Sequence, residues 1–203
     1  MESTDDSFLT ISAVSEGLYK DKGSKFIAKA FPVESEEDIR QLLDEVKKQY
    51  HDARHHCYAW VLGHDQSNYR MNDDGEPSGT AGRPIYGQLL SAGVTNVLLV
   101  VVRYFGGTKL GVRGLINAYK GAAQDALNQS QIVKKLRIKT IKILFEYSSM
   151  GEVMKIIKDH QLEILNHTYE RSAVVIVFTV RLALERKVIF RLNSVSNLTI
   201  NAL

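Results

Sequence analysis

The fold is decided by the segment Asn96-Val97-Leu98-Leu99-Val100-Val101-Val102-Arg103, the most apolar stretch of the 203-residue chain. Its six consecutive apolar residues lack polar alternation, which predicts a strand covered on both faces, because a half-exposed strand would alternate. The run Val97–Val102 is also far too short to cross a bilayer as a helix. Gly106 and Gly107 then end the strand. The segment therefore predicts a buried strand of an α/β domain.

Working outward, the chain alternates strand and helix signals. Ser35 with Asp38 three residues on predicts a capped helix whose apolar positions run to Tyr50. A second helix begins near Pro84 and stops at Gly93. The remaining elements predicted for this half are strands at 8–14, 24–33, 58–62 and 69–71, a loop at 73–82 and a helix at 114–128.

The pattern changes at Lys134. Charged and apolar residues exchange strand faces there, which predicts a bulge or a domain entry near Thr140. Ser149 to Glu152 forms a capping-box sequence that opens a helix. With strands at 164–169, 173–182 and 198–200 and a helix at 184–192, the order is βαββαβ, that of a ferredoxin-like domain. We therefore predict an α+β protein with an N-terminal α/β domain at 1–133 and a ferredoxin-like domain at 134–203.

Composition indicates a cytoplasmic globular protein. The acidic, polar start Met1–Asp6 is unlike a signal peptide, and Cys57 is the single cysteine, which excludes an internal disulfide and a cysteine-based zinc cluster. Residues 1–133 hold 14 Lys/Arg against 17 Asp/Glu, whereas residues 134–203 hold 12 against 6. This asymmetry is typical of a nucleic-acid or acidic partner for the basic half, and equally of a solvated basic domain.

The densest polar segment is Asp73-Asp74-Gly75-Glu76-Pro77-Ser78-Gly79-Thr80-Ala81-Gly82-Arg83-Pro84. Its carboxylates could hold a metal, or its amides along Ser78–Gly82 could cradle a phosphate at the following helix N-terminus. Alternatively, the segment is a structured Ω-loop that uses Asp and Gly for turn geometry. It is not a Walker A loop, because the glycine spacing differs and no Gly-Lys-Ser/Thr follows.

A second polar segment, Arg103–Gly111, follows the apolar strand, and ligands of α/β sheets often bind at a strand's carboxyl end. Arg103 is placed there to pair with a carboxylate of the first loop or with a ligand phosphate. The competing interpretation makes Arg103 a structural partner of Asp73 or Asp74. A structure distinguishes these by showing where the guanidinium points.

The histidines and the cysteine make weak site candidates. His55 and His56 are adjacent on a predicted strand, so their side chains diverge and do not converge on zinc. Cys57 borders the same strand and is expected to be a buried, inert thiol. In the second domain the basic residues are nucleic-acid candidates, although the aromatic pattern of an RNA-recognition motif is lacking. These candidates are Lys134, Lys135, Arg137, Lys139 and Lys142.

On these residues the chain resembles the IMPACT/YigZ family. The matching pieces are Lys22–Phe26, Asp52–Ala59, Asp73–Pro84, Val101–Gly111, and Gly114-Leu115 through Tyr119. Arg54 and Arg113 are small departures that add positive charge near the glycine-rich strand end. The resemblance implies an N-terminal fold similar to the second domain of a small-subunit ribosomal protein. It also implies a C-terminal domain similar to ferredoxin-like domains of translation elongation factors.

In eukaryotes the family regulates the starvation-responsive translation kinase by binding that kinase's ribosome-associated coactivator. Those relatives carry an additional N-terminal interaction domain that is not expected here, so the kinase-pathway role is not carried over. We expect a non-enzymatic, translation-associated protein that binds RNA, the ribosome or a translation protein, without a metal or cofactor. The alternative is an enzyme or sensor for a phosphorylated small molecule, with a divalent metal. The candidate binding residues are His55, Asp73, Asp74, Glu76, Ser78, Gly79, Thr80, Arg83, Arg103, Tyr104, Gly106, Gly107, Lys109 and Arg113.

Overall fold

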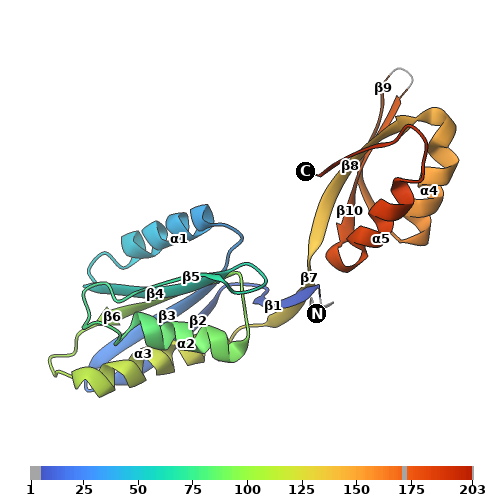
Figure 1. The fold of residues 1–203 in the computed structure, drawn as a ribbon. Helices are drawn as coiled ribbons and strands as arrows, with labels where there is room; N and C mark the ends of the chain where they lie inside the picture. The colour runs from blue at the N-terminus through green and yellow to red at the C-terminus, as the bar shows by residue number, and fades with distance from the viewer. Residues whose placement is uncertain (1–5, 171–172, 203) are drawn as a thin grey trace. The chain divides into compact units, whose positions relative to one another are not determined.

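The computed structural model describes residues 6–170 and 173–202, and the chain divides into two compact units. The N-terminal unit spans Phe8–Lys135, and the C-terminal unit spans Leu136–Leu203 together with the start of the chain, where Asp6 and Ser7 are described. Each unit is described by itself (Figure 1). The N-terminal elements are β1 (Ser7–Ile11), β2 (Ser15–Asp21), β3 (Ser24–Pro32), α1 (Glu36–Gln49), β4 (His55–Leu62), β5 (Asn68–Asn72), α2 (Gly82–Ala92), β6 (Val97–Tyr104), α3 (Gly111–Asn128) and β7 (Ile132–Leu136).

The apolar run lies in β6, the middle strand of a five-stranded sheet ordered β2-β3-β6-β4-β5. Val97, Leu99 and Val101 belong to the core beneath α2 and α3. The alternate residues, Leu98, Val100 and Val102, belong to the core beneath α1 on the other face (Figure 1). The prediction of a strand covered on both faces is therefore confirmed. Because every strand pair in this sheet is antiparallel, however, the carboxyl ends of its strands do not share one edge.

Local signals set both predicted helix ends in this unit. The Ser35 hydroxyl accepts a hydrogen bond from the Asp38 amide, and the Asp38 carboxylate accepts one from the Ser35 amide, which completes the predicted capping box. Gly93 ends α2 in the left-handed conformation, with a φ of 64°. Both boundaries were predicted from the sequence and are confirmed.

Strand β2 was missed, and the predicted strand at 8–14 ends early, at Ile11. Glu16, Gly17 and Lys20 break the apolar alternation that marks a strand, so the period-two signal is weak. Gly17 has a tertiary role instead, because a Cβ there would lie 2.2 Å from the amide nitrogen of Ala126 in α3. The sheet thus approaches the helix backbone at a position that only glycine fits.

The C-terminal unit has the predicted βαββαβ order, so the whole chain is α+β. Its sheet is ordered β11-β8-β10-β9, and the core residues of both longer helices lie on one face of it (Figure 1). Pairing along β8 and β10 is antiparallel without a shift from one end to the other. The elements are β8 (Ile138–Glu146), the 3₁₀ turn η1 (Tyr147–Ser149), α4 (Met150–Asp159), β9 (Glu163–Glu170), β10 (Ala173–Arg181), α5 (Leu182–Leu192) and β11 (Thr199–Ala202).

Two local predictions in this unit are wrong. The break expected near Thr140 lies at Arg137, between β7 and β8. Lys139 is on the side of β8 that faces the core, but it lies beyond the end of the core and pairs with Glu185, so the strand continues through it. Ser149 does not cap α4 through its side chain, because it closes the preceding 3₁₀ turn. The sequence pattern fitted a capping box, but Ser149 belongs to the 3₁₀ turn and its hydroxyl makes no capping hydrogen bond to α4.

Asp6 belongs to the C-terminal unit although it lies near the start of the sequence. Its carboxylate accepts hydrogen bonds from Arg181 Nη2 at 2.8 Å and Arg181 Nε at 3.2 Å, and from the Ala183 amide at 3.2 Å. The Arg181 hydrogen bonds hold the pKa of Asp6 below its usual range. Asp6 thus supplies an acceptor for the first turn of α5, which has no side-chain cap from its own N-cap residue.

Candidate functional site

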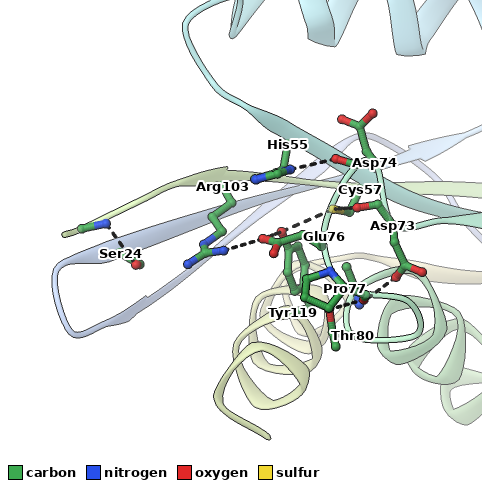
Figure 2. A network of polar contacts seen from close by, with 12 residues as sticks. Ser24, His55, Cys57, Asp73, Asp74, Glu76, Pro77, Thr80, Arg103 and Tyr119 are labelled. Atoms are coloured by element: carbon green, nitrogen blue, oxygen red, sulfur yellow. Dashed lines mark hydrogen bonds and ion pairs between the residues drawn. The ribbon is translucent and has the colours of Figure 1, made fainter. Parts of the chain in front are cut away.

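At the end of β6, Arg103 and Glu76 form a buried ion pair. Arg103 Nη1 lies 2.6 Å from Glu76 Oε1, and the two side chains are 8% and 4% exposed. Figure 2 shows the Glu76 carboxylate between Arg103 and Tyr119, whose hydroxyl donates to the same oxygen at 2.8 Å. The Glu76 carboxylate thus accepts hydrogen bonds from donors on two different elements, which offsets part of the free-energy cost of desolvating the pair.

Arg103 reaches Glu76 because of strand parity. It continues the row Val97, Leu99 and Val101, so its side chain emerges on the face covered by α2 and α3. The guanidinium carbon lies 5.5 Å from the ring centroids of both Phe26 and Phe105, within cation–π range. The predicted pairing with a loop carboxylate is therefore found. The partner is Glu76, so the specific pairing with Asp73 or Asp74 is wrong.

Cys57 and Tyr119 extend this network into the core. The Cys57 thiol lies 3.0 Å from the carbonyl oxygen of Asp73 and 3.3 Å from the Tyr119 hydroxyl, which in turn donates to Glu76. Burial raises the pKa of both the Cys57 thiol and the Tyr119 hydroxyl. The thiol is therefore held neutral, as expected for an inert, buried cysteine.

Asp73 organises the acidic loop from within. Its carboxylate accepts hydrogen bonds from the amides of Gly79, Ala81 and Gly82 at 2.8–2.9 Å. The Ala81 and Gly82 amides lie at the start of α2 and the Gly79 amide in the loop before it, so Asp73 takes the place of an external anion at that helix N-terminus. The hypothesis of a phosphate cradle along Ser78–Gly82 is accordingly wrong for these amides, and the loop has the self-bracing character of an Ω-loop.

Asp74 and the adjacent histidines fix the other side of the loop. The Asp74 carboxylate accepts from the His56 amide at 2.6 Å, while its carbonyl oxygen lies 2.8 Å from His55 Nδ1. Since a carbonyl only accepts, His55 Nδ1 carries the proton and donates. His56 instead points to the α1 face, where its Nε2 donates to the Tyr50 carbonyl at 3.1 Å. The two rings diverge across the strand, as predicted.

The glycine-rich segment after β6 is shaped by one close backbone contact. A Cβ on Gly106 would lie 1.9 Å from the carbonyl carbon of Gly23 in the β2–β3 turn. The Gly106 amide also donates to the Ser24 hydroxyl at 3.1 Å (Figure 2). Gly107 has open space around it but a φ of 86°, which glycine adopts without strain. The two glycines are therefore needed for different physical reasons.

A pocket of about 900 Å³ opens beside the Arg103–Glu76 pair. Its volume is within the range of small-molecule sites. Five of the predicted site residues line it: His55, Glu76, Arg103, Tyr104 and Lys109. Its other lining residues are Asp52, Ala53, Arg54, Pro77, Phe105, Leu110, Gly111, Val112 and Leu115.

The remaining predicted residues lie elsewhere. Asp73, Gly79 and Thr80 form the internal loop contacts, with the Thr80 hydroxyl donating to the Pro77 carbonyl at 2.6 Å. The others are Asp74 beside the histidines and the solvent-exposed Ser78, Arg83, Gly106, Gly107 and Arg113. The loop was thus predicted as one site, but the structure divides it into a brace at Asp73 and a pocket wall at Glu76.

The basic residues of the second half are partly neutralised. Lys139 Nζ lies 2.6 Å from Glu185 Oε1, and Lys135 Nζ lies 3.9 Å from Glu34 Oε1. Lys134 is exposed, and Arg137 and Lys142 are half-buried. This stretch therefore presents less free positive charge than its composition indicates.

Tyr119 was not predicted as a site residue, and it lay only in the predicted helix at 114–128 and in the segment that matches the family. Its signal was present, because it is the one polar-tipped side chain among Ala118, Ala122 and Ala126. A buried tyrosine hydroxyl normally has a hydrogen-bond partner, so a tyrosine in that position indicates a polar group facing α3. Leu110, Val112 and Leu115 line the pocket, but nothing in the sequence marks them as site residues.

The described residues contain neither a metal-binding cluster nor a membrane-spanning helix. Across residues 6–170 and 173–202, no group of three or more His, Cys, Asp or Glu side chains is arranged to hold a metal ion. No helix in the described part of the chain is long and apolar enough to span a membrane. The site is thus an ion pair, an aromatic ring and an adjoining pocket.

Comparison with known proteins gives the chain its family. Residues 22–127 match the model of the Impact N-terminal domain. The IMPACT family member YigZ of Escherichia coli K12 is 36% identical over 151 residues, which cover 73% of this chain and 74% of that protein. A protein IMPACT homolog of Saccharomyces cerevisiae is 38% identical over 96 residues, covering 45% of this chain and 36% of that protein.

A solved structure extends the match to both units. The crystal structure of a hypothetical protein is 31% identical, covers 98% of each chain and aligns with a TM-score of 0.73. The matched region of the family model includes the acidic loop, the end of β6 and most of α3, so it contains the Glu76–Arg103–Tyr119 network. The chain belongs to the IMPACT family.

Proposed function

We propose that this chain is a non-enzymatic, translation-associated RNA-binding protein of the cytoplasm. The single observation that carries the proposal is the charged and aromatic surface around the pocket. Arg54 and Lys109 line the pocket and are exposed, Arg113 is exposed in the first turn of α3, and Phe105 is 56% exposed. Cations that follow a phosphate backbone beside an exposed aromatic ring are the usual components of single-strand binding.

The charge around this pocket supports an anionic partner. Arg103 and Glu76 cancel, and Asp52 is engaged by the Tyr104 hydroxyl at 2.7 Å. Lys109 and Arg54 have no carboxylate partner among the described residues. They are therefore free to contact phosphates, in contrast to Lys139 in the C-terminal unit.

The translation link rests on family resemblance. The family includes eukaryotic IMPACT proteins, and the resemblance implies an N-terminal domain similar to a ribosomal-protein domain and a C-terminal domain similar to elongation-factor domains. Proteins of the translation apparatus work in contact with RNA, so an RNA partner is consistent with both resemblances. The neutral Cys57 thiol and the ion-paired Glu76 supply no activated nucleophile or free base, which favours a binding role.

The proposal is tested by fluorescence anisotropy with a labelled single-stranded RNA of eight nucleotides, from low to physiological salt. We expect Lys109→Ala and Arg113→Ala each to weaken binding and to lower the slope of log affinity against log salt by about 0.7. Lys48→Ala is the matched control, because Lys48 is exposed on α1, which covers the other face of the sheet. If the wild-type protein binds neither this RNA nor ribosomal subunits at low ionic strength, the proposal is wrong.

A second candidate function is binding of a phosphorylated small molecule, which the volume of the pocket favours. His55, Arg103 and Lys109 lie on its lining and are chemically suited to a phosphate group. Calorimetric titration with inorganic phosphate and a nucleotide panel, with and without Mg²⁺, tests it. Saturable heat that requires Lys109 and is unaffected by added RNA would favour this function over the first.

A further inference from the structure

The floor of the pocket has unused hydrogen-bonding capacity. Glu76 accepts two hydrogen bonds, both through Oε1, and Arg103 donates one, through Nη1. Among the described residues, Glu76 Oε2 and Arg103 Nη2 therefore have no hydrogen-bond partner, although both side chains line the pocket. Arg103 Nε is likewise buried without a partner. Buried polar groups are normally satisfied, so the buried, unpartnered Nε of Arg103 indicates a ligand, to which the solvent-accessible Glu76 Oε2 and Arg103 Nη2 offer an acceptor and a donor.

The charge of the floor narrows the chemistry of that ligand. The carboxylate and guanidinium are in direct contact at 2.6 Å, so their charges cancel at the pocket floor. A bare anion placed there would face Glu76 as closely as Arg103. A neutral group that offers a donor and an acceptor side by side matches the free acceptor of Glu76 and the free donor of Arg103.

The walls narrow it further. The lining also includes apolar side chains, among them Pro77, Phe105, Leu110 and Val112, beside the polar Asp52, His55 and Tyr104. Phe105 is 56% exposed and lies over the guanidinium, so one face of its ring is available for stacking. A flat, aromatic ligand with hydrogen-bonding groups on one edge fits an apolar slot that ends in a polar floor.

The mouth of the pocket adds positive charge. Arg54 and Lys109 lie on the lining and are exposed to solvent, in contrast to the buried pair at the floor. A ligand with an aromatic ring at one end and phosphates at the other would place the ring edge on the buried pair and the phosphates beside Arg54 and Lys109. A nucleotide unit of a single strand has this layout.

We propose that the pocket holds one unstacked nucleobase of single-stranded RNA, with its hydrogen-bonding edge on Glu76 and Arg103, its face on Phe105 and its phosphates at Arg54 and Lys109. The inference rests on the proposed RNA-binding function and assigns to it a base-holding pocket. Every nucleobase offers adjacent donors and acceptors, so the proposal is that the pocket holds a base and does not specify which of the four it is.

The experiment uses an eight-unit ribose-phosphate strand without bases and the same strand with one base in its middle, a different base in each of four versions. The cationic mouth contacts both strands equally, so the ratio of their affinities isolates the pocket. We expect at least one of the four bases to raise the affinity of the full-length protein about tenfold, as is typical of stacking a base on an aromatic side chain. Affinities are measured by competition against the labelled RNA.

A pocket-filling variant removes this gain without disturbing the buried pair. Val112 is 61% exposed and lines the pocket, so Val112→Trp places a large ring in the slot from a tolerant surface position. Asn117→Trp is the matched control, because Asn117 is exposed on the same helix and is not a lining residue. We expect Val112→Trp to abolish the gain from the base and to leave binding of the baseless strand unchanged, and Asn117→Trp to leave both unchanged. Circular dichroism verifies that both variants are folded.

The outcomes separate the two proposals. If the baseless strand binds and no base adds affinity, the base-holding pocket is overturned and the RNA-binding function stands. If no strand binds, RNA binding itself fails, and free nucleosides decide whether the pocket holds a base at all. Nucleoside binding that Val112→Trp blocks supports the pocket, whereas inorganic phosphate binding as tightly as the nucleotides overturns it in favour of a phosphate site.

Discussion

Arg103 Nη1 and Glu76 Oε1 lie 2.6 Å apart beneath the surface of the N-terminal unit, at the point where the central strand leaves the core. The pair joins a strand end to an acidic loop that precedes it by more than twenty residues in sequence. Removal of one partner leaves a buried charge uncompensated, which is far more costly than loss of an exposed pair.

We therefore expect Glu76→Gln to lower the free energy of unfolding of the N-terminal unit by about 3 kcal/mol. The substitution keeps a carbonyl oxygen for the Tyr119 hydroxyl and removes only the charge opposite Arg103. Urea unfolding followed by the fluorescence of Trp60, the single tryptophan, measures it. Glu37→Gln, which breaks an exposed pair with Arg40, should cost under about 0.5 kcal/mol. Equal losses in the two variants would contradict a structural role for the buried pair.

Asp73 is expected to stabilise the acidic loop more than any of its exposed residues. Asp73→Ala removes the acceptor of three amides, one in the loop and two at the start of α2, so we expect a loss of about 2 kcal/mol or more. Asp73→Asn keeps one side-chain oxygen and should lie between wild type and alanine. Ser78→Ala is the control in the same loop, because Ser78 is exposed, and its unfolding midpoint should match that of wild type.

The neighbouring glycines should differ sharply when each is replaced by alanine. Gly106→Ala places a Cβ 1.9 Å from the backbone of Gly23, so we expect a loss of about 3 kcal/mol or more. Gly107→Ala meets no atom within 4 Å, and its cost is confined to the positive φ, about 1–2 kcal/mol. Thermal unfolding of the two variants side by side measures the difference. A larger loss for Gly107→Ala would mean that the close contact with the β2–β3 turn is absent.

The contribution of Asp6 to stability should depend on pH. The Arg181 hydrogen bonds lower the pKa of Asp6 in the folded state, so the stabilisation is present above the unfolded value of about 4. It is lost as the pH falls through the lowered folded-state pKa. Asp6→Asn should therefore be less stable than wild type at pH 7, and the difference should shrink as the pH falls below about 4.

Circular dichroism during urea unfolding at several pH values measures this dependence. Trp60 lies in the N-terminal unit, so its fluorescence transition serves as an internal control and should be the same in Asp6→Asn and wild type. A destabilisation that stays constant across the whole pH range would contradict the ionised Asp6–Arg181 pairing.

Those features that follow from local pattern were predictable from the sequence. The run Val97–Val102, which lacks polar alternation, predicted a strand covered on both faces, because burial on both faces leaves no polar position. The Ser35 capping box and the Gly93 stop placed helix ends through groups within a few residues. The C-terminal βαββαβ order followed from periodicity alone.

Features that depend on tertiary contact were not predictable. Strand β2 carries Gly17 because the backbone of α3 lies against it, a fact that no local pattern contains. Loop carboxylates one to three residues apart look alike in sequence, so the choice of Glu76 over Asp73 or Asp74 as the partner of Arg103 depended on which one faces α3. Ser149 does not cap α4 because it lies in a 3₁₀ turn that no sequence pattern indicates.

The Asp6–Arg181 contact has a consequence for how the chain acquires its structure during synthesis. Asp6 precedes the whole N-terminal unit in the sequence, yet its partner follows 175 positions later, after that unit has been made. Helix α5 therefore receives its acceptor only when two segments 175 positions apart meet, a closure of high contact order that is slow compared with local folding. During synthesis, the N-terminal unit can be complete while the C-terminal unit still lacks this contact. A translational pause, or a bulky fusion next to Asp6, would therefore affect the folding of the C-terminal unit.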